Sequence, residues 1–306
     1  MDKDYNLITV LGPTATGKTK FGVLLAHKLN GEIISADSRQ IYRKMDIGTG
    51  KDINDYYVQK KIIPYHLIDI KEPGYKYNVY EFQKDFLLVF NDIISRNKLP
   101  VLCGGSGLYI ESVIKGYKLT EVPINQKLRD ELEKINYDDL VKILKSYKKL
   151  HNKTDIDTKK RLIRAIEISQ YYKTNPEKHI DYPEIKTFVF GIKFDRNTVK
   201  KRITQRLEYR LKNGMIEEVK VLLDLGIKPE QLIYYGLEYK YLTYYITGKI
   251  KYEEMCTKLN IEIHRFSKRQ MTWFRRMERN GIKIHWLDGY LPIEKKIERA
   301  LSLLEL

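Results

Sequence analysis

Cysteine is almost absent from this sequence, which has 2 cysteines in 306 residues. Cys103 and Cys256 lie far apart and lack metal-ligand spacing, so neither a disulfide framework nor a zinc site is expected. No apolar run approaches the roughly 20 residues that a membrane-spanning helix needs. The N-terminal segment MDKDYN carries acidic residues and does not have the pattern of a secretory signal. We therefore expect a protein of the reducing cytoplasm that does not enter a membrane.

Acidic residues are scarce relative to basic ones, with Asp+Glu 40 against Lys+Arg 56 and a formal net charge of +16. Such an excess is explained either by a lysine-rich solvated surface or by a polyanionic partner. The composition leaves both explanations open, so the positions of the charges must decide between them. A content of 42% hydrophobic and 31% charged residues fits a globular protein with a sizeable core.

The stretch GPTATGKT, Gly12–Thr19, has the spacing G-x-x-x-x-G-K-[ST] of a phosphate-binding loop. It lies between an apolar run at Tyr5–Leu11 and a helical pattern at Phe21–Leu29, the strand–loop–helix context that the motif requires. The glycines let backbone N–H groups turn toward a phosphate, Lys18 adds a cation, and Thr19 offers a hydroxyl to Mg²⁺. These residues alone do not distinguish a kinase from a transferase that merely expels diphosphate.

Further apolar runs alternate with helical patterns along most of the chain. Strands are expected at Glu32–Ala36, Tyr65–Ile70, Leu99–Gly107 with its glycine turn, Lys186–Asp195 and Ile282–Gly289. Helices are expected from about Leu108, over Thr198–Gly226 and over Tyr252–Asn280. The alternation predicts an α/β fold with a parallel, doubly wound sheet.

One segment, from Glu121 to about Glu184, breaks this alternation because it contains no convincing strand. Its patterns predict short helices at Ile124–Ile135, Tyr137–Tyr147 and Thr158–Tyr172. We therefore expect a core formed by residues 1–120 and 186–306, with a helical insertion domain at residues 121–185.

Asp37 follows the second predicted strand, within SADSRQIYRKMDIGTGK at Ser35–Lys51. Ligands of open α/β sheets bind beyond the carboxyl ends of the strands, so Asp37 should face the same crevice as Lys18. A carboxylate in that place can accept a proton or position magnesium. Asp37 and Ser38 could equally cap a following helix.

A second glycine turn, CGGSGLY at Cys103–Tyr109, ends another predicted strand and should expose Ser106 at its tip. An ordinary strand-to-helix turn needs one glycine, so three glycines predict the close approach of a ligand. Asp69, in HLIDI, could be the carboxylate that follows a strand in nucleotide hydrolases, or a cap or turn residue. The sequence favours neither role.

Basic residues gather on one side of a predicted helix over Ile261–Arg279. At about 100° per residue, one arc of about 120° contains six cations and a threonine: Arg265, Lys268, Arg269, Thr272, Arg275, Arg276 and Arg279. The other side carries Ile263, Phe266, Trp273, Phe274 and Met277. A solvated face would contain more acids, so we expect a core-packed helix whose cations meet a phosphate backbone. A smaller basic cluster in the insertion comprises Lys159, Lys160, Arg161 and Arg164.

Taken in order, these segments resemble the tRNA dimethylallyltransferase family, also called tRNA isopentenyltransferases. The resemblance covers nearly the whole chain and rests on GPTATGKT, DSRQIYRKMDIGTGK, PYHLIDI, CGGSGLY, KRLIRAIE and FSKRQMTWFRR. The zinc finger that ends eukaryotic members is missing, so the chain is similar to the bacterial type. The resemblance implies a P-loop NTPase-like core with a helical insertion domain.

The resemblance also implies an activity. The enzyme would transfer a dimethylallyl group from dimethylallyl diphosphate to the exocyclic amine of the tRNA adenine that is 3′-adjacent to the anticodon, releasing diphosphate. Mg²⁺ is the implied cofactor, and the tRNA anticodon stem-loop is the implied partner. A monomer is the default expectation.

Individual residues take roles by the same resemblance. The implied catalytic residues are Asp37 as the base, with Thr19 and Lys18 at the diphosphate; Thr19 and Asp37 are the implied Mg²⁺ residues. The implied diphosphate-binding residues are Gly12, Thr14, Ala15, Thr16, Gly17, Lys18, Thr19 and Arg206. The implied tRNA-binding residues are Asp37, Ser38, Arg39, Gln40, Ser106, Arg129, Lys160, Arg161, Arg164, Lys268, Arg269, Gln270, Arg275 and Arg276.

The chain departs from the family pattern at a few positions, none of which is Lys18, Thr19 or Asp37. They are Tyr65 for a usual histidine, Arg210 for a common methionine, Lys160 for a usual glutamine, and the divergent segment YYGLEYK.

Three other functions remain open on the sequence. A small-molecule kinase would use the phosphate loop but not the cationic helix. An adenylate isopentenyltransferase would act on a free nucleotide and would need no basic surface. An RNA-binding switch or ATPase would carry out no group transfer.

Overall fold

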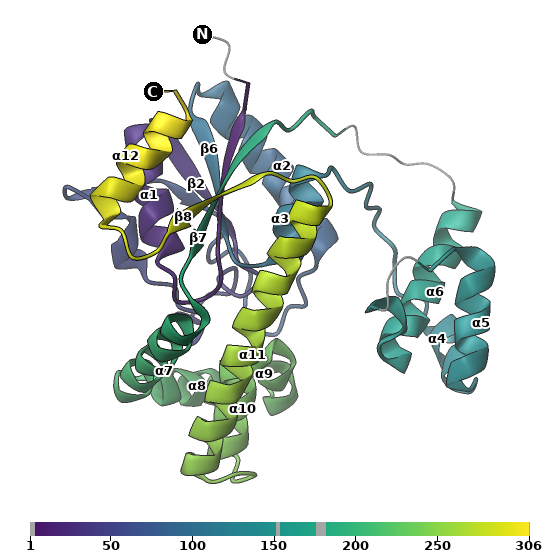
Figure 1. Cartoon of the computed structure of the whole chain (residues 1–306). Coiled ribbons are helices and arrows are strands. Elements are labelled where there is room, and N and C mark those ends of the chain that lie inside the picture. Colours follow the sequence, from purple (N-terminus) through teal and green to yellow (C-terminus); the bar gives the residue numbers. More distant parts are fainter. Residues whose placement is uncertain (1–3, 151–153, 176–181, 306) are drawn as a thin grey trace. The chain divides into compact units, whose positions relative to one another are not determined.

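The structure is a computed structural model that describes residues 4–150, 154–175 and 182–305 (Figure 1). The chain divides into two compact units, Met1–Gly116 with Glu184–Leu306, and Tyr117–Pro183. We call the first the core unit and the second the insertion unit.

The core unit is built on a six-stranded sheet in the order β5-β2-β6-β1-β7-β8, in which every neighbouring pair is parallel. The strands are β1 (Leu7–Leu11), β2 (Gly31–Ala36), β5 (Tyr65–His66), β6 (Leu99–Gly104), β7 (Thr187–Lys193) and β8 (Ile284–Asp288). The predicted α/β fold with a parallel sheet is confirmed, as is the last edge strand. All residues of β1 and β2 are buried, because helices cover both faces of the sheet.

Two pairs of helices cover the sheet. The helices α1 (Lys18–Lys28) and α12 (Ile293–Leu303) pack together over one face. On the other face lie α2 (Val79–Ser95) and α3 (Gly107–Ile114) (Figure 1). A short 3-10 helix (Ile53–Tyr56) and the small hairpin of β3 (Tyr57–Val58) and β4 (Lys61–Ile62) lie between β2 and β5 along the chain.

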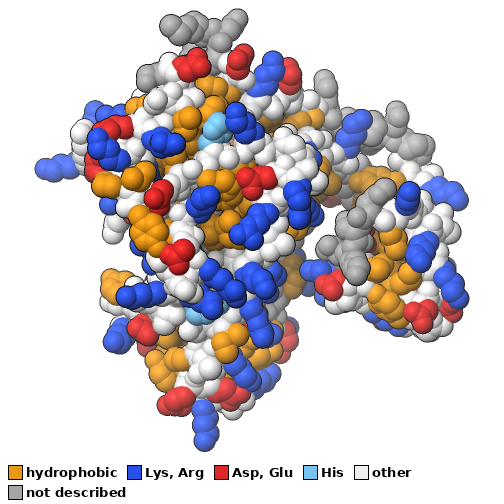
Figure 2. Space-filling model, in the orientation of Figure 1, with side chains coloured by type: hydrophobic (Ala, Val, Ile, Leu, Met, Phe, Trp, Pro, Cys, Tyr) orange, Lys and Arg blue, Asp and Glu red, His pale blue; other side chains and the backbone are white. Residues whose placement is uncertain are grey.

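Between β7 and β8 the chain forms five helices: α7 (Arg196–Lys212), α8 (Met215–Asp224), α9 (Pro229–Tyr235), α10 (Leu237–Ile246) and α11 (Tyr252–Arg279). The single helix expected over Thr198–Gly226 is two helices, because the chain turns at Gly214 with a φ of 96°. The long helix expected over Tyr252–Asn280 is present as α11. On the face shown in Figure 2, lysines and arginines gather where α11 lies.

The strand expected over Tyr65–Ile70 is limited to Tyr65–His66. Leu67 and Asp69 have left-handed φ angles of 61° and 55°, which are incompatible with an extended strand. The apolar run is therefore buried in a turn rather than in a ladder.

The insertion unit contains the three predicted helices, α4 (Gln126–Glu133), α5 (Tyr137–Tyr147) and α6 (Lys159–Thr174), and a 3-10 turn (Thr154–Ile156). They enclose a small apolar core of their own, formed by Leu132, Leu140, Leu144, Leu162, Ile163, Ala165 and Ile166. None of the helices in the described part of the chain is long and apolar enough to cross a bilayer.

Candidate functional site

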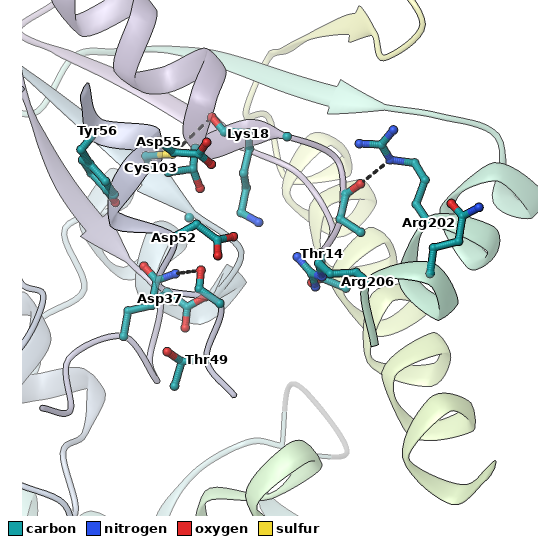
Figure 3. Close-up of a pocket in the computed structure, with 17 residues that line it drawn as sticks. Thr14, Lys18, Asp37, Thr49, Asp52, Asp55, Tyr56, Cys103, Arg202 and Arg206 are labelled. Atoms are coloured by element: carbon teal, nitrogen blue, oxygen red, sulfur yellow. Dashed lines mark hydrogen bonds between the residues drawn. The ribbon is translucent and has the colours of Figure 1, made fainter. Parts of the chain in front are cut away.

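A pocket of about 370 Å³ lies beside the phosphate loop and joins segments that are far apart in the sequence (Figure 3). It is lined by the loop, by the segment after β2, by the end of β6 and by α7. Its charged lining residues are Lys18, Arg202, Arg206, Asp37, Asp52 and Asp55. The prediction that Asp37 and Lys18 share one crevice is confirmed.

The phosphate loop lies between β1 and α1 in a tight conformation. Ala15 and Gly17 have left-handed φ angles of 64° and 79°, and α1 begins at Lys18. Among the described residues, no side chain caps α1 and no acid lies in its first turn. The N–H groups and the positive dipole end of α1 are therefore left for an anion.

Six of the eight residues expected at the diphosphate line the pocket: Thr14, Ala15, Gly17, Lys18, Thr19 and Arg206. The other two, Gly12 and Thr16, are buried residues of the loop that do not line the pocket. The Thr16 hydroxyl donates to the Pro13 carbonyl at 2.8 Å, and a Cβ at Gly12 would lie 3.0 Å from the Ile192 carbonyl. Thr16 and Gly12 thus shape the loop.

Two arginines of α7 reach the loop from one helical turn apart. Arg202 Nε donates to the Ala15 carbonyl at 2.7 Å, and Arg206 Nη2 donates to the Thr14 hydroxyl. Sequence reasoning identified Arg206 but missed Arg202. The signal was available, because residues four apart share one face of a helix.

Burial disfavours the charged forms of two cations of this pocket, Lys18 and Arg206. Burial lowers the pKa of the Lys18 ammonium, although Asp37 raises it. Burial and the neighbouring Arg210 lower the pKa of Arg206 to about 10. An anion bound between these groups would favour their charged forms and would itself be stabilised.

Asp37 forms a turn rather than a helix cap. Its Oδ1 accepts a hydrogen bond from the Arg39 N–H at 2.9 Å, and irregular turns follow within the described chain. Asp37 Oδ2 makes no hydrogen bond to any described residue, so it is available to a group in the pocket. Asp37 and Gln40 line the pocket, whereas the Ser38 N–H donates to Ser106 Oγ at 3.0 Å.

Two further carboxylates of the pocket, Asp52 and Asp55, were missed by sequence reasoning. Burial raises the pKa of Asp55, and the nearby Asp52 raises it further. Asp52 forms an ion pair with Arg210 at 3.5 Å. Asp52 directly follows the motif DIGTGK, which was the one available signal for it.

Asp69 is a turn residue that holds Lys51. The Lys51 ammonium is buried and pairs with Asp69 and, at 2.6 Å, with Asp46. It also donates to the Tyr42 carbonyl at 2.8 Å. Of the two roles that the sequence left open for Asp69, the structure therefore shows the turn residue, and its carboxylate is paired with Lys51.

The three glycines of CGGSG lie in close contact with other parts of the protein, and Gly104 also lines the pocket, so the close approach of a ligand stays a prediction. A Cβ at Gly104 would lie 2.3 Å from the Ala36 carbonyl oxygen. A Cβ at Gly105 would lie 2.4 Å from Gln270 Nε2, and one at Gly107 would lie 2.4 Å from Trp273 Cδ1. Ser106 is half-buried rather than exposed.

Gln270 lies on the buried side of α11, although it was expected among the tRNA-binding residues. Its Oε1 accepts from the Thr14 N–H at 2.9 Å, and its Nε2 donates to the Gly105 carbonyl at 3.0 Å. With 7% of its surface exposed, it connects the phosphate loop to the glycine turn.

The cationic side of α11 is exposed as predicted, with one exception. Ile263, Phe274 and Met277 are buried, and the exposed cations are Arg265, Lys268, Arg269, Arg275 and Arg279. The exception is Arg276, which is half-buried, pairs with the buried Glu111 and lies 4.0 Å above the Trp273 ring. Arg265 pairs with Glu262 at 2.6 Å.

Two cations expected at the tRNA are held within the insertion unit. Arg129, at 2.7 Å, and Arg164 both pair with the buried Glu167. Burial alone would raise the pKa of Glu167, but hydrogen bonds from these arginines hold it below its ordinary value. Arg161 pairs with Asp157 at 2.8 Å, and Lys160 is exposed.

Comparison with known proteins gives consistent matches along the whole chain. A family model described as "IPP transferase" matches residues 40–277, and one described as "Isopentenyl transferase" matches residues 5–62. A tRNA dimethylallyltransferase 1 of Parabacteroides distasonis is 58% identical over 302 residues, covering 99% of this chain and 98% of the relative. A tRNA dimethylallyltransferase 2 of Phocaeicola vulgatus is 56% identical over 300 residues, covering 98% of each.

Solved structures are similar as well. The full-length tRNA isopentenylpyrophosphate transferase from Bacillus halodurans has a TM-score of 0.71 at 33% identity, over 98% of this chain and 96% of that one. A eukaryotic dimethylallyltransferase acting on tRNA has a TM-score of 0.77 at 23% identity, over 98% of this chain and 79% of that one, which shows a common fold.

Proposed function

The chain belongs to the IPP transferase (tRNA dimethylallyltransferase) family, and we propose that it transfers the dimethylallyl group of dimethylallyl diphosphate to tRNA. The acceptor is the exocyclic amine of the adenine 3′-adjacent to the anticodon. The observation that carries the proposal is one pocket in which a phosphate loop, two arginines and the carboxylate of Asp37 meet (Figure 3).

The donor's diphosphate binds to the loop. The N–H groups at the start of α1, with Lys18, Arg202 and Arg206, surround it with positive charge. As the allylic carbon–oxygen bond breaks, negative charge grows on the leaving oxygen, and these preorganised groups stabilise it. Diphosphate leaves whole, so no phosphoryl group is transferred.

The acceptor nitrogen forms the new carbon–nitrogen bond and must lose a proton. Its lone pair is delocalised into the adenine ring, which makes it a poor nucleophile. Asp37 has an oxygen without a partner among the described residues and lines the pocket that holds Lys18. We assign it the role of the base that takes the proton.

Mg²⁺ fits the oxygen atoms available here. Thr19 and Asp37 both line the pocket, and the described residues contain no cluster of three or more His, Cys, Asp or Glu side chains that could hold a metal ion. Mg²⁺ takes one or two protein ligands together with substrate phosphates and water, so it does not need such a cluster. Thr19 and Asp37 would hold the ion, which would neutralise diphosphate charge.

A polyanionic acceptor explains the exposed side of α11, which a kinase or a free-nucleotide enzyme would not need. Within residues 4–150, 154–175 and 182–305, Lys268, Arg269 and Arg275 make no ion pair, so their charges are available. They lie on the helix whose Gln270 contacts the phosphate loop. We propose that they bind the tRNA backbone.

The variant Lys268→Gln/Arg269→Gln/Arg275→Gln should weaken tRNA binding and flatten its salt dependence. If all three cations meet phosphates, the slope of log affinity against log salt should change by about 2–3. Arg276 is left in place, since its removal would strand the buried Glu111. Titration of tRNA at several salt concentrations measures the slope.

A matched control removes the same charge elsewhere in the core unit. Lys84, Lys220 and Arg299 are exposed residues of α2, α8 and α12, and their triple glutamine variant should keep most of the affinity and the slope. Equal losses in both triple variants would contradict the assignment, because they would reflect net charge alone.

A further inference from the structure

The carboxylate of Glu218, near the start of α8, is bound by a turn of backbone in the core unit. Its Oε2 accepts from the N–H groups of Asp46 and Ile47 at 2.8 and 2.7 Å, and its Oε1 accepts from that of Gly48 at 3.0 Å. Oε1 also accepts from the Tyr239 hydroxyl at 2.8 Å. Consecutive N–H groups that converge in this way form an anion-binding concavity, and here a side chain of the protein fills it.

Two glycines of the same segment permit close approach of the neighbouring helices. A Cβ at Gly48 would lie 2.7 Å from the Tyr239 hydroxyl, and one at Gly50 would lie 2.4 Å from Arg210 Nη2. Gly50 also has a left-handed φ of 71°. We call the segment Asp46–Gly50 the clamp loop. It is hydrogen-bonded to Glu218 of α8 and packs against Arg210 of α7 and Tyr239 of α10.

The clamp loop is also part of the pocket. Thr49 and Gly50 line it beside Asp37 and Asp52 (Figure 3). The Gly50 carbonyl accepts from Gln40 Nε2 at 3.1 Å, which connects the loop to the turn that carries Asp37. A shift of the clamp loop would therefore move the wall beside the proposed base, on the side away from the phosphate loop.

We propose that Glu218 is a positioning residue for the transfer reaction: through the clamp loop it sets the wall against which the acceptor adenine is presented to Asp37. The inference rests on the proposed function. Glu218 itself is not among the residues that line the pocket, so it acts through the loop and touches neither substrate. In this proposal Glu218 acts on the part of the pocket that receives the acceptor adenine, whereas Lys18, Arg202 and Arg206 bind the donor's diphosphate.

The variant Glu218→Gln replaces one acceptor oxygen with an NH₂ group, which cannot accept from the N–H groups that it faces. The clamp loop should then lose some of the hydrogen bonds that hold it to α8. Because misplacement by about 1 Å can lower a rate on the order of 10²-fold, kcat/KM for tRNA should fall by about that factor. The Kd of dimethylallyl diphosphate and the number of donor sites per chain should stay unchanged.

Glu217→Gln is the matched control. Glu217 is the exposed neighbour of Glu218 in the same first turn of α8, so its variant carries the same charge change at the same helix dipole. It should transfer at the wild-type rate. Tyr239→Phe removes one of the four hydrogen bonds to Glu218 and should produce a smaller loss in the same direction.

Hydrogen exchange provides a readout that needs no activity. The amides of Asp46, Ile47 and Gly48 should be protected in the wild type and in Glu217→Gln, and should exchange faster in Glu218→Gln. A merely structural role would instead reduce the number of donor sites in step with the rate. If the wild-type protein transferred nothing to tRNA, the proposed function would be contradicted. The exchange result would still test whether Glu218 holds the clamp loop in place.

Two results would overturn the inference. One is a Glu218→Gln variant that matches Glu217→Gln in both amide exchange and kcat/KM for tRNA. The other is a loss of transfer that is matched by an equal loss of donor sites. If Glu218→Gln does not fold, Tyr239→Phe decides, and unchanged amide exchange together with unchanged transfer would contradict the role.

Discussion

Replacing Asp37 with alanine should lower the rate of dimethylallyl transfer by about 10²–10⁴-fold, the range expected when a general base is lost. Asp37 is expected to take the proton that the adenine amine must lose as the new bond forms. The loss should appear in single-turnover rates with both substrates saturating, because neither the phosphate loop nor the exposed side of α11 is altered. Binding of tRNA should stay within about an order of magnitude of wild type.

Asp37→Asn and Asp55→Asn separate the base from a general effect of charge. Both remove one carboxylate from the same pocket while keeping the side chain's shape. Asp37→Asn should be nearly as slow as Asp37→Ala, whereas Asp55→Asn should retain most of the activity. A near-wild-type rate for Asp37→Asn would remove Asp37 from the proton transfer.

Replacing Lys18 with alanine should lower transfer by about 10²–10³-fold, the usual loss when one preorganised charge stabiliser is removed. Lys18 lies at the start of α1 and lines the pocket, where burial already lowers its pKa. Burial disfavours its charged form, so an anion bound beside it would favour that form and would itself be stabilised. The variant should bind dimethylallyl diphosphate more weakly in calorimetry and should bind tRNA as before.

Lys20→Ala is the control for this change, because Lys20 is exposed on the same first turns of α1. It should leave donor affinity and rate near wild type. If Lys18→Ala bound the donor normally and lost affinity for tRNA, the assignment of the phosphate loop to the donor would be wrong.

The sequence predicted those parts of the site that local patterns determine. The phosphate loop is recognisable because its spacing and its strand–helix context lie within 25 residues, Tyr5 to Leu29. The shared crevice of Lys18 and Asp37 follows from the parallel sheet, since both come just beyond strand ends. The exposed and buried sides of α11 follow from helical periodicity.

Partners across the fold could not be predicted in the same way. The glycines of CGGSG suggested the close approach of a ligand, but the sequence did not show that Ala36, Gln270 and Trp273 also lie against them. Arg276 has the helical position of a free cation, yet it pairs with Glu111, which lies 165 positions away in the sequence. Which group approaches a glycine or an arginine is decided by packing between distant segments, and no local pattern records it.

The contact between Glu218 and the clamp loop could not be predicted from the sequence either. DIGTGK ends a segment that carries the family resemblance, but its two glycines are explained only by Tyr239 and Arg210, which come from helices more than 150 positions later. Arg202 was within reach of sequence reasoning, since it lies one helical turn before Arg206. Asp55 was not, and Asp52 was signalled only by its place after DIGTGK, because their position in the pocket of Lys18 depends on the turn that follows the clamp loop.

The central claim is that a phosphate loop of this type holds a leaving diphosphate and that no phosphoryl group moves. Dimethylallyl diphosphate labelled with carbon-14 in the allyl group and with phosphorus-32 in the diphosphate tests it directly. After incubation with Mg²⁺ and either tRNA or AMP, carbon-14 should be found in tRNA, phosphorus-32 should be found only in unreacted donor and free diphosphate, and AMP should remain unlabelled. Phosphorus-32 in RNA or nucleotide would contradict the claim in favour of a kinase, and carbon-14 in AMP but not in tRNA would contradict the assigned acceptor.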